Sequence, residues 1–221
     1  MSHDIHCRRS ADFFESHFIL SYGDKRRFDL MLDKCRRVEG PDGDGSHHVD
    51  RVGWLARQIA IAMGLDQQMA LELGLASKLH DIGKTVLDPD ILGKAGRLTA
   101  EEFDKVRKHA LLGADLISGG GPFFDLARQI ALSHHERWDG AGYPYGLKGK
   151  DIALPARIVA VADSLDVMMH KRPYKSSWPA SVAIENLVAD SGGQFDPEII
   201  WVVAARPHEF LHRCSIGGQR I

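Results

Sequence analysis

Residues 46–83 have the sequence SHHVDRVGWLARQIAIAMGLDQQMALELGLASKLHDIG, and this stretch decides the fold class. Gly64 divides it and stands where a helix would take its C-terminal cap. In the first half, one helical face carries His48, Val52, Leu55 and Ile59. In the second half, the same spacing recurs at Met69, Leu73, Ala76, Leu79 and His80. The sequence therefore predicts helices at about 47–63 and about 66–81.

The helical pattern continues towards the C-terminus. Thr99 and Glu102 form a capping box that opens a third helix, and the sequence GGGP at 119–122 ends it. Further helices are predicted at about 123–136, 155–170, 179–190 and 196–206, with a Gly- and Pro-rich loop at 140–149. Because no segment alternates with period two, the sequence predicts an all-α bundle of about seven core helices.

The chain is predicted to be one domain with a short N-terminal extension. The sequence EGPDGDG at 39–45 is typical of a loop and sets the boundary, so residues 1–45 are interpreted as an extension or linker and residues 46–221 as the domain. Residues 25–37 have helical spacing, but this part is too short to fold alone.

Composition excludes several classes of protein. The 28 basic and 30 acidic side chains give a net charge of −2, which disfavours a nucleic-acid polymer as partner. No apolar run approaches the ~20 residues that cross a bilayer, and charges interrupt the N-terminus where a signal peptide would be apolar. We therefore expect a cytoplasmic protein with no membrane partner. The three cysteines, at positions 7, 35 and 214, are expected to be free thiols.

Paired histidines and aspartates carry the candidate chemistry. His80-Asp81 lies at a predicted helix end and can offer an imidazole and a carboxylate to one metal, although a buried His–Asp hydrogen bond is the commoner explanation of such a pair taken alone. For His134-His135, metal ligation and exposure at the surface are about equally good explanations when the pair is taken alone. Asp163 lies in an apolar stretch, so its carboxylate needs a metal ion or an arginine partner.

Other candidates are weaker by themselves. His48 and His109 each lie on a predicted helix and indicate nothing alone. The sequence KRPYK at 171–175 gathers three cations, which suit phosphate oxygens but also suit a solvated turn.

Taken in order, these motifs resemble the HD-GYP family of cyclic di-GMP phosphodiesterases. The resemblance covers about residues 46–206 and is carried by His48, HDIGK at 80–84, His109, HHE at 134–136, DGAGYP at 139–144, AD at 162–163 and RPYK at 172–175. It implies an HD-type helical bundle that uses metal ions to hydrolyse cyclic di-GMP to linear pGpG, with further cleavage to GMP left open.

The resemblance also implies roles for individual residues. The metal ligands fall on His48, His80, Asp81, His109, His134, His135 and Asp163. Asp81, the bridging carboxylate, and Lys84 are implied as catalytic. The substrate contacts fall on Lys84, Tyr143, Asp166, Arg172 and Lys175. Two divalent ions are implied, and imidazole and carboxylate ligands without thiolate favour iron or manganese. A third ion would need Asp44, because some members carry a carboxylate one turn before the first histidine.

Alternative functions stay open. Another cyclic dinucleotide such as cyclic GMP-AMP is the rival substrate, because metal ions bind the phosphodiester and not the base. The rival function is a non-catalytic module that senses the nucleotide or docks a diguanylate cyclase or other regulator through the loop at Gly142-Tyr143-Pro144. A homodimer is also left open.

Overall fold

Helices account for all regular structure in the described part of the chain. The computed structural model describes residues 20–39, 47–170 and 177–211. Its α-helices are α1 (Tyr22–Val38), α2 (His48–Ala62), α3 (Gln67–Ser77), α4 (Pro89–Leu92), α5 (Ala100–Arg107), α6 (His109–Ile117), α7 (Pro122–Ser133), α8 (Leu154–Met169), α9 (Ala180–Ala189), α10 (Pro197–Ala205) and α11 (Pro207–Leu211). Two 3₁₀ helices join them, η3 (Ile82–Val86) and η4 (Gly149–Asp151). No strand forms within those ranges, so the all-α prediction is confirmed.

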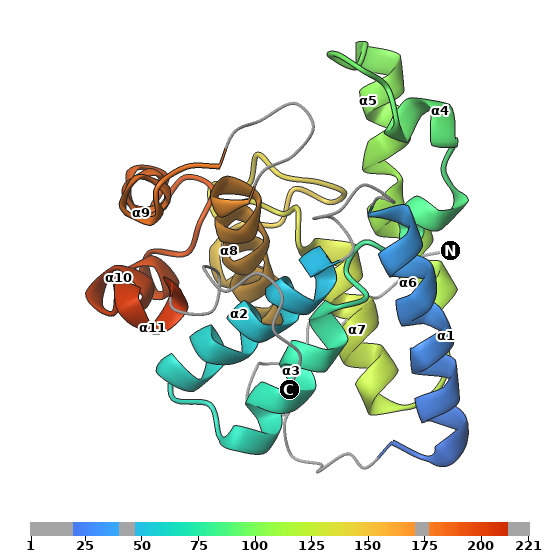
Figure 1. Cartoon of the computed structure of the whole chain (residues 1–221), viewed down its shortest axis with the longest axis horizontal. Coiled ribbons are helices and arrows are strands. Elements are labelled where there is room, and N and C mark those ends of the chain that lie inside the picture. The colour runs from blue at the N-terminus through green and yellow to red at the C-terminus, as the bar shows by residue number, and fades with distance from the viewer. Residues whose placement is uncertain (1–19, 40–46, 171–176, 212–221) are drawn as a thin grey trace.

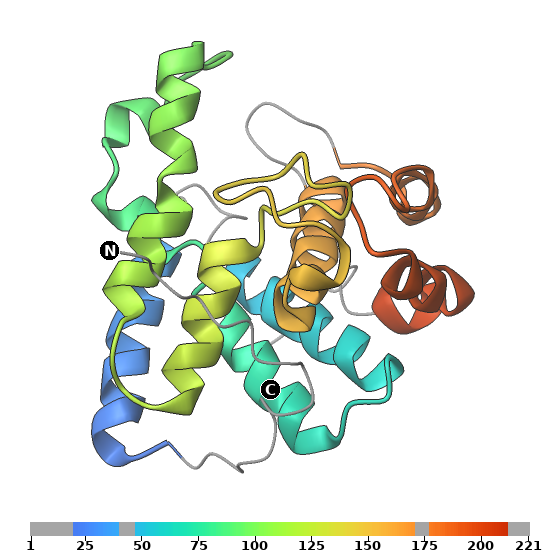
Figure 2. The same ribbon diagram turned by 180° about the vertical axis from the view of Figure 1, so that it is seen from behind.

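One hydrophobic core holds the bundle together. Helices α2, α3, α7 and α8 surround the centre, α1 and α6 lie together on one side, and α9, α10 and α11 lie on the other (Figures 1 and 2). The largest fully buried side chains include Leu55, Ile59, Leu73, Phe124 and Ile158. These apolar faces stabilise the helices by burial, which leaves the helix ends to carry the polar residues.

Helix α1 is part of this core. Phe28, Leu32 and Cys35 are buried in the same cluster as α2 and α7. Arg27 donates hydrogen bonds to the carbonyl oxygens of Ile117 at 2.8 Å and Ser118 at 3.0 Å, and so ties α1 to the end of α6. The predicted boundary at residue 45 therefore falls between two parts of one hydrophobic core.

The structure corrects two predicted helices. The helix predicted from Thr99 is split at Lys108 into α5 and α6, although its capping box is present. The Lys108 amide bonds the Lys105 carbonyl at 3.2 Å, and His109 Nδ1 donates to the Val106 carbonyl at 2.7 Å, so the chain turns there. The helix predicted at about 66–81 ends at Ser77, and the turn that follows continues into η3.

No helix within the described ranges has both the length and the apolarity that crossing a bilayer requires.

Candidate metal centre

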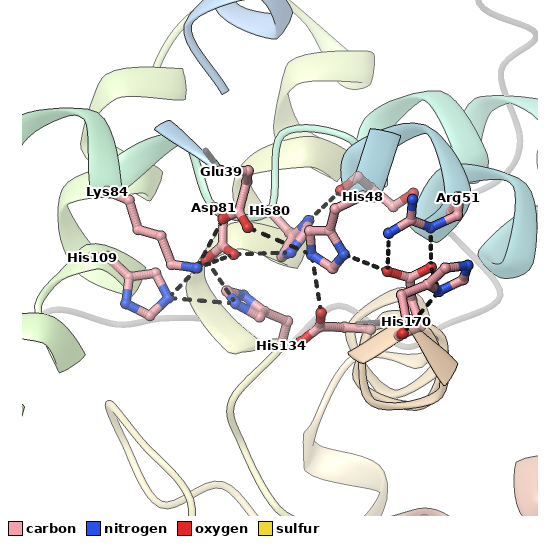
Figure 3. A network of polar contacts seen from close by, with 12 residues as sticks. Glu39, His48, Arg51, His80, Asp81, Lys84, His109, His134 and His170 are labelled. Carbon is pink, nitrogen blue, oxygen red and sulfur yellow. Dashed lines mark hydrogen bonds and ion pairs between the residues drawn. The ribbon is translucent and has the colours of Figure 1, made fainter. Parts of the chain in front are cut away.

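The predicted metal ligands meet where several helices begin or end. They are His48 and His109, the first residues of α2 and α6, His80 and Asp81 after α3, His134 and His135 after α7, and Asp163 inside α8. The rings of His48, His80, His109 and His134 lie around Asp81 (Figure 3). The helix ends thus bring together residues that are separated by up to 115 positions in the chain.

Asp81 lies between two groups of donor atoms. In one group, Asp81, His109, His134 and His135 each offer a donor atom within 4.8 Å of the others, and in the second, His48, His80 and Asp163 do the same. Asp81 Oδ1 lies 3.2 Å from His109 Nε2, and Asp81 Oδ2 lies 3.2 Å from His80 Nε2. One carboxylate therefore faces both groups, as a bridging ligand must.

Unpaired donor atoms test whether this cluster suits metal ions. His48 Nε2, His80 Nε2 and Asp81 Oδ1 are buried and make no hydrogen bond within the described residues. Burying a polar atom without a partner is unfavourable, so these atoms favour a ligand that accepts lone pairs. The residues therefore fit divalent cations bound by imidazole and carboxylate.

The opposite ring nitrogens are fixed by hydrogen bonds. Nδ1 donates to a backbone carbonyl in His80 (Ser77, 2.8 Å), His109 (Val106, 2.7 Å) and His134 (Ala131, 3.0 Å). In the neutral imidazole, an Nδ1–H leaves a lone pair on Nε2, and the three Nε2 atoms lie 3.2, 3.2 and 3.7 Å from oxygens of Asp81. A ligating histidine is commonly oriented in this way by a partner behind it.

Protonation states agree with metal binding for most of the first group. Burial lowers the pKa of His109 to about 4 and holds the pKa of His135 well below its usual value. Burial alone would raise the pKa of Asp81, but the charges of Lys84 and His80 hold it well below its usual range. Neutral imidazoles beside an ionised carboxylate are the forms that metal binding requires.

His48 differs because two carboxylates flank it. Burial opposes its charge, but the adjacent carboxylates of Asp163 and Asp166 outweigh burial and raise the pKa of His48 to about 10. Its Nε2 lies 3.3 Å from Asp163 Oδ1. A metal ion bound there must displace the proton of His48.

Asp166, a predicted substrate contact, lies in a buried network of polar side chains. Its side chain is 1% exposed and lies behind His48, whose Nδ1 is 2.7 Å from Asp166 Oδ2. Arg51 Nε donates to Asp166 Oδ1 at 2.6 Å, and His170 also contacts this carboxylate. Asp166 thus orients the ring of His48 from the side away from the cluster, and its contact with a substrate stays a prediction.

Glu39 is a member of the site that the sequence analysis assigned to the linker. Its side chain is 5% exposed, and it forms a third candidate ligand group with His48 and Asp81. Only its position directly after the helical pattern at 25–37 distinguishes it in the sequence. Asp44, the carboxylate that was predicted for a third ion, lies outside the described residues.

Lys84 contacts the cluster through two carboxylates. Its Nζ donates to Asp81 Oδ2 at 2.6 Å and to Glu39 Oε1 at 2.9 Å. Burial would lower the pKa of Lys84, but these two carboxylates outweigh it and raise the pKa, so the side chain is a cation. Arg172 and Lys175, the other predicted cationic contacts, lie outside the described residues.

Tyr143 borders a pocket beside the first ligand group. Its ring stacks on His135 with a centroid distance of 4.7 Å and an interplanar angle of 26°. Burial raises the pKa of Tyr143, so its hydroxyl keeps its proton and can donate a hydrogen bond. The adjoining pocket has a volume of about 310 Å³ and is also lined by His134, Arg137 and Gln194.

Comparison with known sequences shows the family to which the chain belongs. Residues 35–199 match the model of a protein family described as HD domain. A cyclic di-GMP phosphodiesterase from Thermotoga maritima is 43% identical over 77% of this chain and 45% of its own length. The cyclic di-GMP phosphodiesterase response regulator RpfG from Xanthomonas campestris is 38% identical over 80% of this chain and 47% of its own length. The chain spans about half the length of these relatives.

Relatives with a different named substrate also match. The 3'3'-cGAMP-specific phosphodiesterase 2 of Vibrio cholerae is 34% identical over 83% of this chain and 35% of its own length. Among solved structures, the cyclic GMP-AMP-specific phosphodiesterase V-cGAP3 of V. cholerae has a TM-score of 0.62 at 20% identity, covering 86% of this chain and 51% of that one. The HD domain of the Listeria monocytogenes phosphodiesterase PgpH, in complex with cyclic di-AMP, has a TM-score of 0.58 at 21% identity over 87% and 99% of the two chains. These structures share the fold.

Proposed function

Because the chain belongs to the HD domain family, we propose that it hydrolyses the phosphodiester bonds of cyclic di-GMP to linear pGpG at a cluster of divalent metal ions. The observation that carries the proposal is the position of Asp81 between two groups of histidines, with Nε2 of His48 and of His80 buried and without a hydrogen bond in one of these groups. Cyclic di-GMP is favoured as the substrate because it is named for relatives at 43% and 38% identity.

The ligand set divides into two sides that share Asp81. His109, His134 and His135 would hold one ion, and His48, His80 and Asp163 the other. When bound, such ions lower the pKa of water and neutralise phosphoryl oxygens. We propose iron or manganese, because the set contains imidazoles and carboxylates and no thiolate.

The side chains around the cluster supply the remaining contacts. Lys84 keeps its charge beside Asp81 and can donate to a phosphoryl oxygen, which stabilises the negative charge of the transition state. Tyr143 can donate its hydroxyl proton in a hydrogen bond from the wall of the adjoining pocket. Arg172 and Lys175 are proposed as further phosphate contacts on the strength of the RPYK motif.

Turnover of two cyclic dinucleotides tests this proposal. Protein loaded with manganese or with iron under anaerobic conditions is mixed with cyclic di-GMP or cyclic GMP-AMP, and the products are separated by chromatography. We expect linear pGpG and a higher kcat/KM for cyclic di-GMP. A preference for cyclic GMP-AMP would support the rival substrate, which the V. cholerae relatives favour. Hydrolysis of neither nucleotide by the loaded protein would support a non-catalytic module.

Glu39 is proposed as the ligand for a third ion. Its carboxylate is buried within reach of His48 and Asp81, and an amide at this position would be neutral and a weaker ligand. We expect metal analysis to find about three ions per chain in the wild-type protein and about two in Glu39→Gln, since the remaining ligands would still hold a two-metal site.

Asp44→Asn is the matched control for Glu39→Gln. It removes a carboxylate from the same stretch of sequence, and its metal content should equal that of the wild type. An unchanged count in Glu39→Gln together with a loss in Asp44→Asn would reverse the assignment.

Three further expectations stay predictions: a protein partner at the loop that contains Tyr143, a homodimer, and a cytoplasmic location.

A further inference from the structure

Helix α5 has no role in the hydrophobic core. None of its residues is buried, and with α4 it projects from one end of the bundle (Figures 1 and 2). Its Phe103 is 48% exposed, although the helix is followed within two residues by the ligand His109. Packing in the core therefore does not account for Phe103.

Phe103 and Arg107 line the pocket that adjoins the metal centre. This pocket also contains His134, His135 and Tyr143, so a molecule whose phosphate reaches the metal ligands would extend towards α5. Its volume of about 310 Å³ leaves room for a planar base next to the phosphate. A cyclic dinucleotide carries its two bases outside the ring of phosphates, and a pocket of this size beside the metal ligands has room for one of them.

The guanidinium of Arg107 is held above the ring of Tyr143. Its Cζ lies 4.6 Å from the Tyr143 ring centroid and 5.9 Å from that of Phe103. A guanidinium above an aromatic ring is attracted to the ring face and keeps its N–H donors free around its rim. Its nearest carboxylate, that of Asp104, is exposed and lies 3.7 Å away, beyond hydrogen-bonding distance.

Arg137, a second cation of the same pocket, is differently placed. Its Nε and Nη2 donate to the two oxygens of Asp139 at 3.1 and 2.7 Å, and its Nη1 donates to Gln194 Oε1 at 3.4 Å. Its donors are therefore engaged within the protein. Arg107 has donors that face the pocket without such partners.

We propose that Phe103 and Arg107 form the guanine-recognition wall of the active site. The inference rests on the proposed function and adds a residue that sets the specificity for the base. Phe103 offers a face on which a base stacks, and Arg107 donates two hydrogen bonds to O6 and N7 of guanine. Adenine carries an amino donor in place of O6. The two N–H groups of the Arg107 guanidinium would then face one acceptor, N7, and one donor, the amino group. The wall therefore selects guanine against adenine.

Two substitutions and two nucleotides test this inference. With metal-loaded protein, kcat/KM is measured for cyclic di-GMP and cyclic di-AMP, and the affinities for GMP and AMP are measured by calorimetry. Arg107→Ala should lower kcat/KM for cyclic di-GMP by about tenfold to a hundredfold, mainly through KM, and leave that for cyclic di-AMP nearly unchanged. Arg107→Lys keeps the charge but lacks the paired N–H donors of the guanidinium. It should therefore recover only a small part of the selectivity that Arg107→Ala loses.

Lys105→Ala is the matched control. It removes a cation from the same helix at an exposed position outside the pocket, so selectivity and metal content should not change. Equal losses for both dinucleotides in Arg107→Ala would overturn the inference, because Arg107 would then act on the phosphate and not on the base. If the wild type cleaves neither dinucleotide, the proposed function fails. In that case the inference is decided by calorimetry alone: a GMP preference that Arg107→Ala removes supports it, and equal GMP and AMP affinities overturn it.

Discussion

Replacing Asp81 with alanine is expected to lower kcat/KM for cyclic di-GMP by at least ~10³-fold, a loss of about 4 kcal/mol of transition-state stabilisation. Its two oxygens face His109 on one side and His80 on the other, and no other described carboxylate lies in both of those positions. Without Asp81, the histidines of the two groups have no shared anionic ligand. Metal content should therefore fall together with activity, as elemental analysis of the purified variant can measure.

The fold should survive this substitution, because the apolar core does not include Asp81. Far-UV circular dichroism should remain helical. Asp50→Asn is the control: Asp50 lies on α2 and pairs with Arg36 and Lys78 outside the ligand groups, so its loss should leave metal content and turnover unchanged. Full hydrolysis by an Asp81→Ala protein that binds metal normally would remove Asp81 from the mechanism.

The second large effect is expected at Gly83, where two backbones approach closely. A Cβ atom there would lie 2.0 Å from the carbonyl oxygen of His109 and 2.6 Å from the amide nitrogen of Gly113. These are backbone atoms, so they cannot rotate away as a side chain would. Gly83→Ala must therefore push η3 away from α6, and it should destabilise the fold by about 3 kcal/mol or more, lowering the Tm by roughly 6–12 °C.

The same displacement should weaken metal binding, because Asp81 precedes η3 and His109 begins α6. Thermal unfolding and metal analysis of one preparation measure both effects. Gly23→Ala in α1 is the control: its nearest neighbour to a new Cβ is Ser21 Oγ at 3.8 Å, and alanine favours the helix, so the Tm should stay equal or rise slightly. A Gly83→Ala protein with wild-type Tm and metal content would contradict the close packing of η3 on α6.

Helix positions could be predicted where an apolar face repeats without interruption. Helices α2, α8, α9 and α10 occupy the predicted ranges because apolar residues recur through each of them at helical spacing and are buried in the core. The break at Lys108 could not be predicted in this way, since Val106 and Ala110 continue the stripe across it. The turn depends on local hydrogen bonds at His109, and these do not alter the spacing of the apolar residues.

The site was predictable to the extent that its residues form adjacent motifs. His80-Asp81 and His134-His135 are visible as pairs, and the resemblance added His48, His109 and Asp163 to them. The contacts of Glu39 and Asp166 could not be predicted from the sequence, because they depend on tertiary structure. Glu39 reaches the cluster only because α1 packs into the core, and Asp166 turns behind His48 because it lies three residues after Asp163 on α8.

Anomalous scattering from crystals of anaerobically purified protein is the most direct test of the central claim, that these helix ends form a polynuclear metal site. Data collected at the iron and manganese edges should show at least one peak on each side of the Asp81 carboxylate. The distance from each peak to the Nε2 atoms of its histidines should be roughly 2.0–2.2 Å. One peak should contact His109, His134 and His135, and the other His48, His80 and Asp163. A map without peaks between these side chains, from protein supplied with both metals, would contradict the account.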